Sequence, residues 1–144
     1  EPLKDDVSVR FLDSRDYPGS ALVGIAIHLL HGEMAYRSGE FAQAAGHFEQ
    51  AVLAQDQLPY TEPPFWYYPT RQSLGAALAA DGKHAEAEAV FRKDLQQYPH
   101  NGWSMFGLAQ SLTAQGKTEE AAKAQMHFEA IWQFADVELT ASIL

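Results

Sequence analysis

The sequence predicts an all-α fold: a right-handed α-solenoid of three helix pairs, closed by a C-terminal capping helix or turn. Three glycines are each followed five residues later by an alanine, and the step from Gly82 to Gly116 is 34 residues. A fixed period of this length is typical of solenoids whose repeat is a pair of helices. Between the glycines, apolar residues recur near the 3.6-residue period of an amphipathic helix. The two patterns together predict the architecture.

Residues 1–18 are expected to form an N-terminal lead-in segment before a repeat domain of residues 19–144. The segment is charged and ends at Pro18-Gly19, which is a turn signal. We expect its apolar side chains, Val7, Val9, Phe11 and Leu12, to pack against the first helix. That helix is predicted from Ser20 to the turn at Ser38-Gly39, and a second helix follows over residues 40–54.

An insertion is predicted at residues 56–69, where four prolines exclude a regular helix. It explains why the step from Gly39 to Gly82 is 43 residues, nine more than the basic period. The insertion contains four adjacent aromatic residues: Phe65, Trp66, Tyr67 and Tyr68. They could form a lid or patch that faces a ligand. The interpretation we favour is that they fill the gap that the insertion creates between the first two pairs.

The second and third helix pairs are predicted at residues 70–80 with 84–97, and at residues 102–114 with 118–134. Thr118 is expected to cap the last helix, with Glu119 and Glu120 in its first turn. Glu88 and Arg92 are expected to form an ion pair on an exposed face. Residues 136–144 are expected to form a terminal turn or a short capping helix.

The pattern of small and aromatic residues resembles the tetratricopeptide repeat family. The matching positions of the three units, in order, are Gly32, Gly39, Ala44 and Phe48; Gly75, Gly82, Ala87 and Phe91; and Ala109, Gly116, Ala121 and Gln125. The resemblance implies repeats at approximately 25–58, 68–101 and 102–135, with small residues facing alanines so that paired helices approach closely. A narrower resemblance, carried by LPYTEPPFWYYPTRQSLGAAL and the stretch after Asn101, is to the C-terminal part of larger bacterial tetratricopeptide repeat proteins of unestablished function.

The family lines a concave groove with the first helix of each pair, so the resemblance implies a set of candidate peptide-binding residues. These are Leu29, Glu33, Tyr36, Arg37, Gln72, Ser73, Trp103, Phe106, Gln110 and Thr113. The mixture of aromatic and polar groups suits peptide binding by stacking and hydrogen bonding. The alternative is that some of them pack against neighbouring helices. No two cations converge among them, so capture of a peptide carboxylate is not expected.

Composition narrows the remaining classes of function. The formal net charge of −9 argues against nucleic acid or an anionic membrane as partner, and there is no cysteine for thiolate chemistry. His28 and His31 are three residues apart and could face one metal with Glu33 or His47, but hydrogen-bonded histidines are the favoured interpretation. No phosphate-binding loop, nucleophile elbow or zinc-protease motif is present, so we expect no cofactor, no metal and no enzymatic activity.

The sequence therefore predicts a protein–protein interaction scaffold that binds a peptide or protein segment in its groove. The alternative is a structural role as the C-terminal scaffold of a longer array, acting through packing or self-association of exposed terminal helices, such as the face around Leu22 and Ile25. The chain begins at Glu1 rather than Met, so a fragment or a processed chain is expected. A soluble protein, cytoplasmic by default, is the expected setting.

Overall fold

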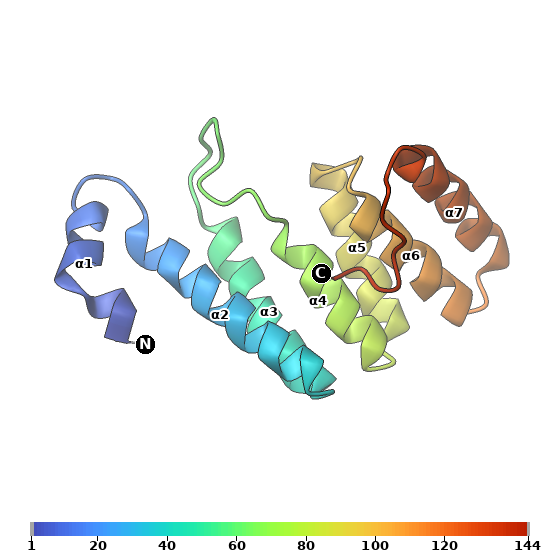
Figure 1. The fold of residues 1–144 in the computed structure, drawn as a ribbon, viewed down its shortest axis with the longest axis horizontal. Helices are drawn as coiled ribbons and strands as arrows, with labels where there is room; N and C mark the ends of the chain where they lie inside the picture. The colour runs from blue at the N-terminus through green and yellow to red at the C-terminus, as the bar shows by residue number, and fades with distance from the viewer. Residues whose placement is uncertain (1, 144) are drawn as a thin grey trace. The chain divides into compact units, whose positions relative to one another are not determined.

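A computed structural model describes residues 2–143, and this part of the chain contains helices and no strand. The elements are a 3-10 helix, Pro2–Asp5 (η1), and the α-helices α1 (Val7–Asp13), α2 (Gly19–Arg37), α3 (Phe41–Asp56), α4 (Thr70–Ala80), α5 (His84–Gln97), α6 (Gly102–Ala114) and α7 (Thr118–Trp132). The chain divides into two compact units, residues 1–70 and 71–144. Both units follow the predicted order of elements (Figure 1).

The first unit is built on the pairing of α2 with α3. Ile25 of α2 and Phe48 of α3 are both fully buried. The Phe48 ring lies directly against Gly32, where an added Cβ would come within 2.4 Å of it. Ala44, the expected partner of this glycine, is also fully buried, but the atoms nearest to Gly32 belong to the Phe48 ring.

The lead-in segment is more regular than the sequence indicated, since η1 and α1 both form and both contact α2. Asp6 caps α1 by accepting a 2.8 Å hydrogen bond from the Ser8 backbone N–H. No residue of α1 is buried, and Val7 and Phe11 are largely exposed, so the expected packing was wrong for these two side chains, whereas Leu12 lies beside Gly19 of α2. A seven-residue helix is too short to present a full apolar stripe to its neighbour.

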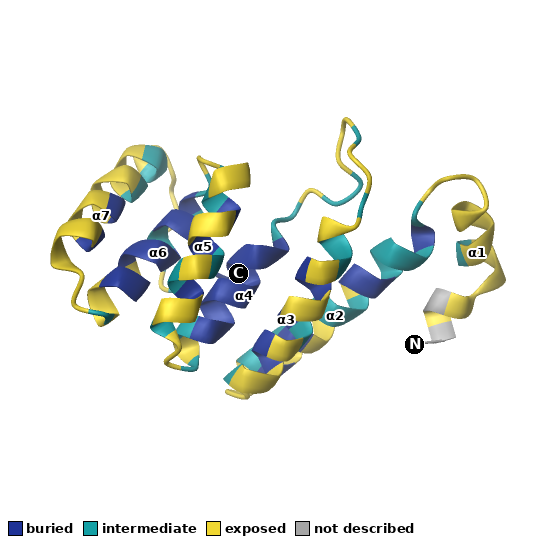
Figure 2. Cartoon of the chain, turned by 180° about the vertical axis from the view of Figure 1, so that it is seen from behind, coloured by how far each residue is buried: buried dark blue, intermediate teal, exposed yellow. Residues whose placement is uncertain are grey.

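The second unit is organised around one aromatic ring. Phe91 of α5 is fully buried and touches both neighbouring helices through glycines, Gly75 on α4 and Gly107 on α6. A Cβ on either glycine would lie 2.4 Å or 2.2 Å from the ring. Close approach at both sides brings α4, α5 and α6 together. Figure 2 shows the result, with α4 and α6 mostly buried and α5 and α7 exposing a broad outer face.

The three predicted turns share one backbone geometry. Gly39, Gly82 and Gly116 have φ of 78°, 77° and 72°, in the left-handed region that favours glycine. In each turn the N–H of the following residue reaches back five residues to a helix carbonyl, for example from Lys83 to Leu78 at 2.9 Å. This is the Schellman arrangement, which satisfies carbonyls that the end of a helix leaves free.

Two boundary predictions need correction. Thr118 is the first residue of α7 and makes no capping hydrogen bond to the helix, because Lys117 occupies the N-cap position. Glu119 and Glu120 do lie in the first turn, as predicted. Within the described residues no helix follows Trp132, so residues 133–143 take the turn-like alternative rather than a capping helix.

Candidate binding surface

A stripe of four residues along α6 contains the predicted groove residues of the third pair. Trp103, Phe106, Gln110 and Thr113 are spaced by three or four residues, so they lie on one side of the helix. Trp103 and Phe106 are half-buried, whereas Gln110 and Thr113 are exposed. The α6 stripe therefore carries apolar rings at one end and polar groups at the other.

The rings of the stripe pack against α7. The centroid of Trp103 lies 5.8 Å from that of Trp132, and Phe106 lies 5.2 Å from Phe128. Phe128 and Trp132 stack on each other at 5.7 Å. These four residues form an aromatic cluster, whose edge-on and stacked contacts hold the two helices at a fixed distance. Gly102 makes room for it, because an added Cβ there would lie 2.4 Å from the Trp132 ring.

The polar end of the stripe borders a hollow of about 620 Å³ between α6 and α7. Most of its lining is small: Ala109, Gln110, Thr113, Ala114, Thr118, Ala121, Ala122 and Gln125. Small side chains leave room for larger ones from another molecule. The α6 stripe, the aromatic cluster and this hollow together make one candidate binding surface.

Two predicted groove residues belong to the interior instead. Gln72 and Ser73 on α4 are both buried, and Gln72 Oε1 accepts a 3.1 Å hydrogen bond from Asn101 Nδ2. Asn101 also donates to Asp94 Oδ2 at 2.8 Å and caps α6 by accepting from the Trp103 backbone N–H. Gln72 thus helps to fix the start of α6.

Asp94 is the only carboxylate among the described residues that is almost completely buried. Burial raises its pKa, while hydrogen bonds from Ser104, at 2.6 Å, and from Asn101 oppose the shift. A carboxylate in this position favours its neutral form more than an exposed one does. Its two donors sit at the start of α6, so Asp94 serves the packing of the helices.

The groove residues predicted in the first unit lie near the end of α2. Glu33 and Arg37 approach to 3.7 Å, and the Tyr36 ring meets Phe41 of α3 edge-on at 5.3 Å. Burial raises the pKa of Glu33, which the Arg37 charge partly offsets. Leu29, one turn earlier, is half-buried. These side chains form a small polar and aromatic group on the first unit, with Arg37 exposed.

The Gln55 side chain, near the end of α3, forms hydrogen bonds that hold the aromatic insertion in place. Gln55 Nε2 donates to the carbonyl oxygen of Tyr68 at 3.2 Å, and its Oε1 accepts from the Thr70 backbone N–H at 3.1 Å. The Phe65 ring packs edge-on against Tyr17 at 5.2 Å, and Trp66 is half-buried. Tyr67 alone among the four aromatic residues is largely exposed. Three of the four aromatic residues are therefore partly covered, whereas Tyr60 and Tyr67 of the insertion are largely exposed.

Three histidines lie together between α2 and α3. The His47 ring centroid lies 5.9 Å from that of His28 and 5.2 Å from that of His31. Across the described residues, no three His, Asp or Glu side chains have an arrangement suited to a metal ion. Glu33, the other ligand considered, pairs with Arg37 instead.

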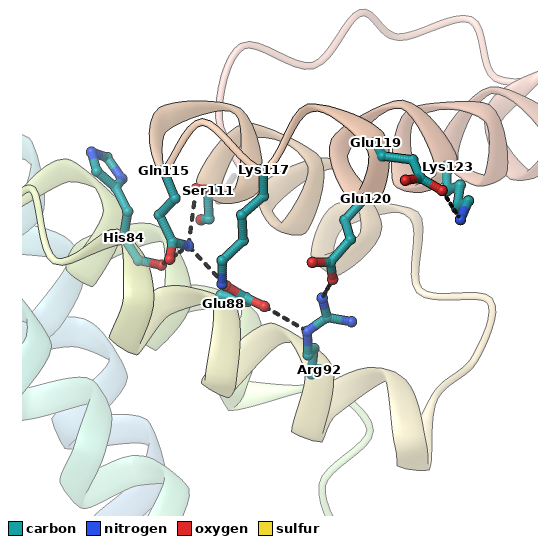
Figure 3. Close-up of polar contacts among 9 residues, drawn as sticks. All are labelled: His84, Glu88, Arg92, Ser111, Gln115, Lys117, Glu119, Glu120 and Lys123. Atoms are coloured by element: carbon teal, nitrogen blue, oxygen red, sulfur yellow. Dashed lines mark hydrogen bonds and ion pairs between the residues drawn. The ribbon is translucent and has the colours of Figure 1, made fainter.

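Sequence patterns did not reveal the charged network that joins α5 to the α6–α7 turn (Figure 3). Glu88 accepts hydrogen bonds from Lys117 Nζ at 2.6 Å, Arg92 Nε at 2.8 Å and Gln115 Nε2 at 2.8 Å. These contacts, led by Lys117, lower the pKa of Glu88 to about 2. Its side chain is only 12% exposed, so the predicted ion pair with Arg92 exists but not on an open face. Lys117 is 29 residues away, beyond any helical spacing rule.

A second depression, of about 470 Å³, was also not predicted. It lies between α5 and α7, over apolar side chains of α6, and charged side chains form its rim. Its lining includes Arg92, Leu95, Met105, Leu108, Leu112, Glu120, Lys123 and His127. Its floor residues follow the ordinary helical period of core positions, so nothing in the sequence distinguishes them from fully covered ones.

Antiparallel helix pairs that are joined by glycine turns, and whose aromatic rings pack against glycines of the neighbouring helix, define a helical-repeat protein. Models of the tetratricopeptide repeat match residues 25–50 and residues 78–124. The chain belongs to the tetratricopeptide repeat family, whose repeats generally mediate protein–protein interaction and typically act as non-enzymatic scaffolds. No curated protein and no solved structure matches the chain significantly. No helix in the described part is long and apolar enough to cross a membrane.

Proposed function

We propose that this chain is an interaction scaffold without enzymatic activity that binds a segment of a partner protein along the α6 stripe. The proposal rests on one observation. Half-buried rings, exposed amide and hydroxyl groups and a hollow lie next to one another on the α6–α7 helix pair. Trp103 and Phe106 offer apolar faces, Gln110 and Thr113 offer hydrogen bonds, and the hollow has room for a partner side chain. This combination is common where a few anchors carry most of the binding energy.

The charge of the chain limits the partner. With 19 acidic against 10 basic residues, the net charge of −9 disfavours nucleic acid and favours a neutral or basic protein segment. Exposed Gln110 can donate to and accept from main-chain groups, and Thr113 can accept, because its hydroxyl already donates to the Ala109 carbonyl oxygen at 2.8 Å. This suits an extended segment, while the aromatic cluster can receive apolar side chains. A peptide or protein segment of another chain is therefore the proposed ligand.

The test is selection of binding peptides from a random twelve-residue phage-displayed library on the full chain, followed by fluorescence anisotropy of the enriched peptide. Gln110→Arg should weaken binding about tenfold, because it blocks an exposed position of the stripe without touching the core. Gln96→Arg is the matched control, since Gln96 is exposed on α5 and belongs to the other depression. Equal loss in both variants, or loss only in the control, would move the binding site away from the α6 stripe.

Self-association is the second candidate, and exposed apolar side chains on α2 favour it. Leu30 and Met34 are each 60% exposed and four residues apart, so they lie on one face. The face around Leu22 and Ile25, expected from sequence to be the exposed one, is not available because Ile25 is fully buried. Sedimentation equilibrium of the chain and of Leu30→Glu tests this candidate. An association that Leu30→Glu abolishes supports it, and a monomer at all concentrations rules it out.

A further inference from the structure

We propose that the C-terminal segment of the chain, residues 139–143, occupies part of the candidate binding surface in cis, so that a partner must displace it. The inference rests on the proposed function, because it assigns a built-in competitor to the same surface. The segment is the occupant, and the part of the candidate binding surface that it occupies is on α6, beside the aromatic cluster.

Burial along the segment is the first evidence. After α7 ends, Phe134 and Val137 are 91% and 54% exposed, as expected for a chain that leaves the body of the protein. The exposed fraction then falls to 3% for Ser142 and 8% for Ile143. An unattached terminal segment would keep its side chains exposed. Residues 142 and 143 are therefore seated on the folded unit.

The path of the segment is the second evidence. In Figure 1 it turns back from the end of α7, crosses in front of α6 and reaches α4, where the end of the chain is marked. Seen from behind in Figure 2, the segment is largely hidden by the helices. It therefore runs over the α4 and α6 side of the second unit and not over the outer face of α5.

A hydrogen bond ties the segment to the aromatic cluster. Trp132 Nε1 donates to the carbonyl oxygen of Val137 at 2.7 Å. The same indole ring stacks on Phe128 and meets Trp103 of the α6 stripe edge-on. This hydrogen bond therefore holds the start of the returning chain at the aromatic cluster, which is part of the candidate binding surface.

The segment does not behave as an end cap. A cap would cover the hollow between α6 and α7, at the end of the array of helix pairs. Yet Gln110, Thr113 and Gln125 on the rim of that hollow are exposed. The segment leaves the hollow open, so it competes with a partner only for the α6 part of the candidate binding surface, beside the aromatic cluster.

A tethered segment competes efficiently even when its contacts are few. A short flexible connection gives an effective concentration on the order of millimolar. If the segment alone bound with a Kd of about 0.1 mM, it would lower the apparent affinity of an external ligand about tenfold. Release of the segment should raise the affinity by the same factor.

Docking is tested first, by paramagnetic relaxation on the full chain. There is no native cysteine, so Thr140→Cys, at an exposed position of the segment, takes a single spin label. We expect broadening of amide signals from α4 and α6, which Ile143→Asp should abolish because it places a charge at a buried position. Val137→Asp is the matched control, because it adds the same charge to the same segment at an exposed side chain. Absent broadening, or broadening that Ile143→Asp leaves unchanged, would overturn the docking.

Competition is tested second, with the library-selected peptide and anisotropy. Ile143→Asp should bind that peptide about tenfold more tightly than the unaltered chain, and Val137→Asp should bind it equally to the unaltered chain. Equal affinity of Ile143→Asp and the unaltered chain would overturn the competition. If neither chain selects a peptide, the proposed function fails, and the competition with it, while the spin-label result still decides whether the segment docks.

Discussion

Gly75 and Gly107 leave room on two helices for the same ring, and this predicts an unusually costly alanine substitution. A Cβ at Gly107 would lie 2.2 Å from Cζ of Phe91, closer than any real contact. The ring has little room to move, because Phe91 is fully buried and its Cε1 atom would lie 2.4 Å from a Cβ at Gly75. Gly107→Ala must therefore separate α5 from α6 or force the ring from its rotamer.

The magnitude follows from two opposing effects. Replacing glycine by alanine inside a helix normally stabilises it by about 0.5–1 kcal/mol, through the lower entropy of the unfolded chain. Adding a methyl group to a filled core costs about 1–3 kcal/mol, because neighbouring groups must move. For Gly107→Ala the second effect is larger, and we expect a net loss of about 1–2 kcal/mol in the free energy of unfolding.

The assay is urea denaturation followed by circular dichroism, with Gly46→Ala as control. Gly46 lies inside α3 with open space around its Cα, so its substitution should stabilise the chain by about 0.5–1 kcal/mol. A double variant, Gly107→Ala with Phe91→Leu, should lose less than the sum of the single losses, because the smaller side chain makes room. Full stability of Gly107→Ala, or strict additivity in the double variant, would refute the account of the interlock.

Three further outcomes are expected. The pKa of Glu88 falls from an ordinary value of 4.5 to about 2, which corresponds to about 3 kcal/mol of folding stability. Because the partners Lys117 and Arg92 are 41% and 44% exposed, solvent screening reduces this contribution to about 1–2 kcal/mol. This stability is present above about pH 4.5 and is lost as the pH falls towards 2, so Glu88→Gln should destabilise the chain at pH 7 and match it at pH 2 in thermal melts. Gly82→Ala, at φ 77°, should cost about 1–2 kcal/mol in urea denaturation, and Gly82→Asn less; equal losses would contradict the left-handed turn. Gln55→Ala should cost about 1–3 kcal/mol and speed chymotrypsin cleavage at exposed Tyr67, and unchanged cleavage would show that the insertion holds its shape without it.

The proposed site was only partly predictable. Trp103, Phe106, Gln110 and Thr113 share one helix, so their common side follows from spacing alone. Their contacts to Phe128 and Trp132 depend on how α6 and α7 are packed, and no local pattern gives that. Gln72 was selected by the same positional rule but is buried, and its Oε1 accepts a hydrogen bond from Asn101 at the start of α6.

The sequence by itself determined the helix pairs and their turns. Glycines with positive φ, prolines and the 3.6-residue apolar period act within a few residues, so their effects can be read locally. Only the tertiary structure decided that Glu88 meets Lys117 and that Ile143 is buried. Such contacts join residues far apart in the chain, and their geometry is set by packing in three dimensions and not by spacing. In this protein, the repeat scaffold follows from local sequence patterns. The position of the segment that we propose to compete for the binding surface follows only from tertiary packing.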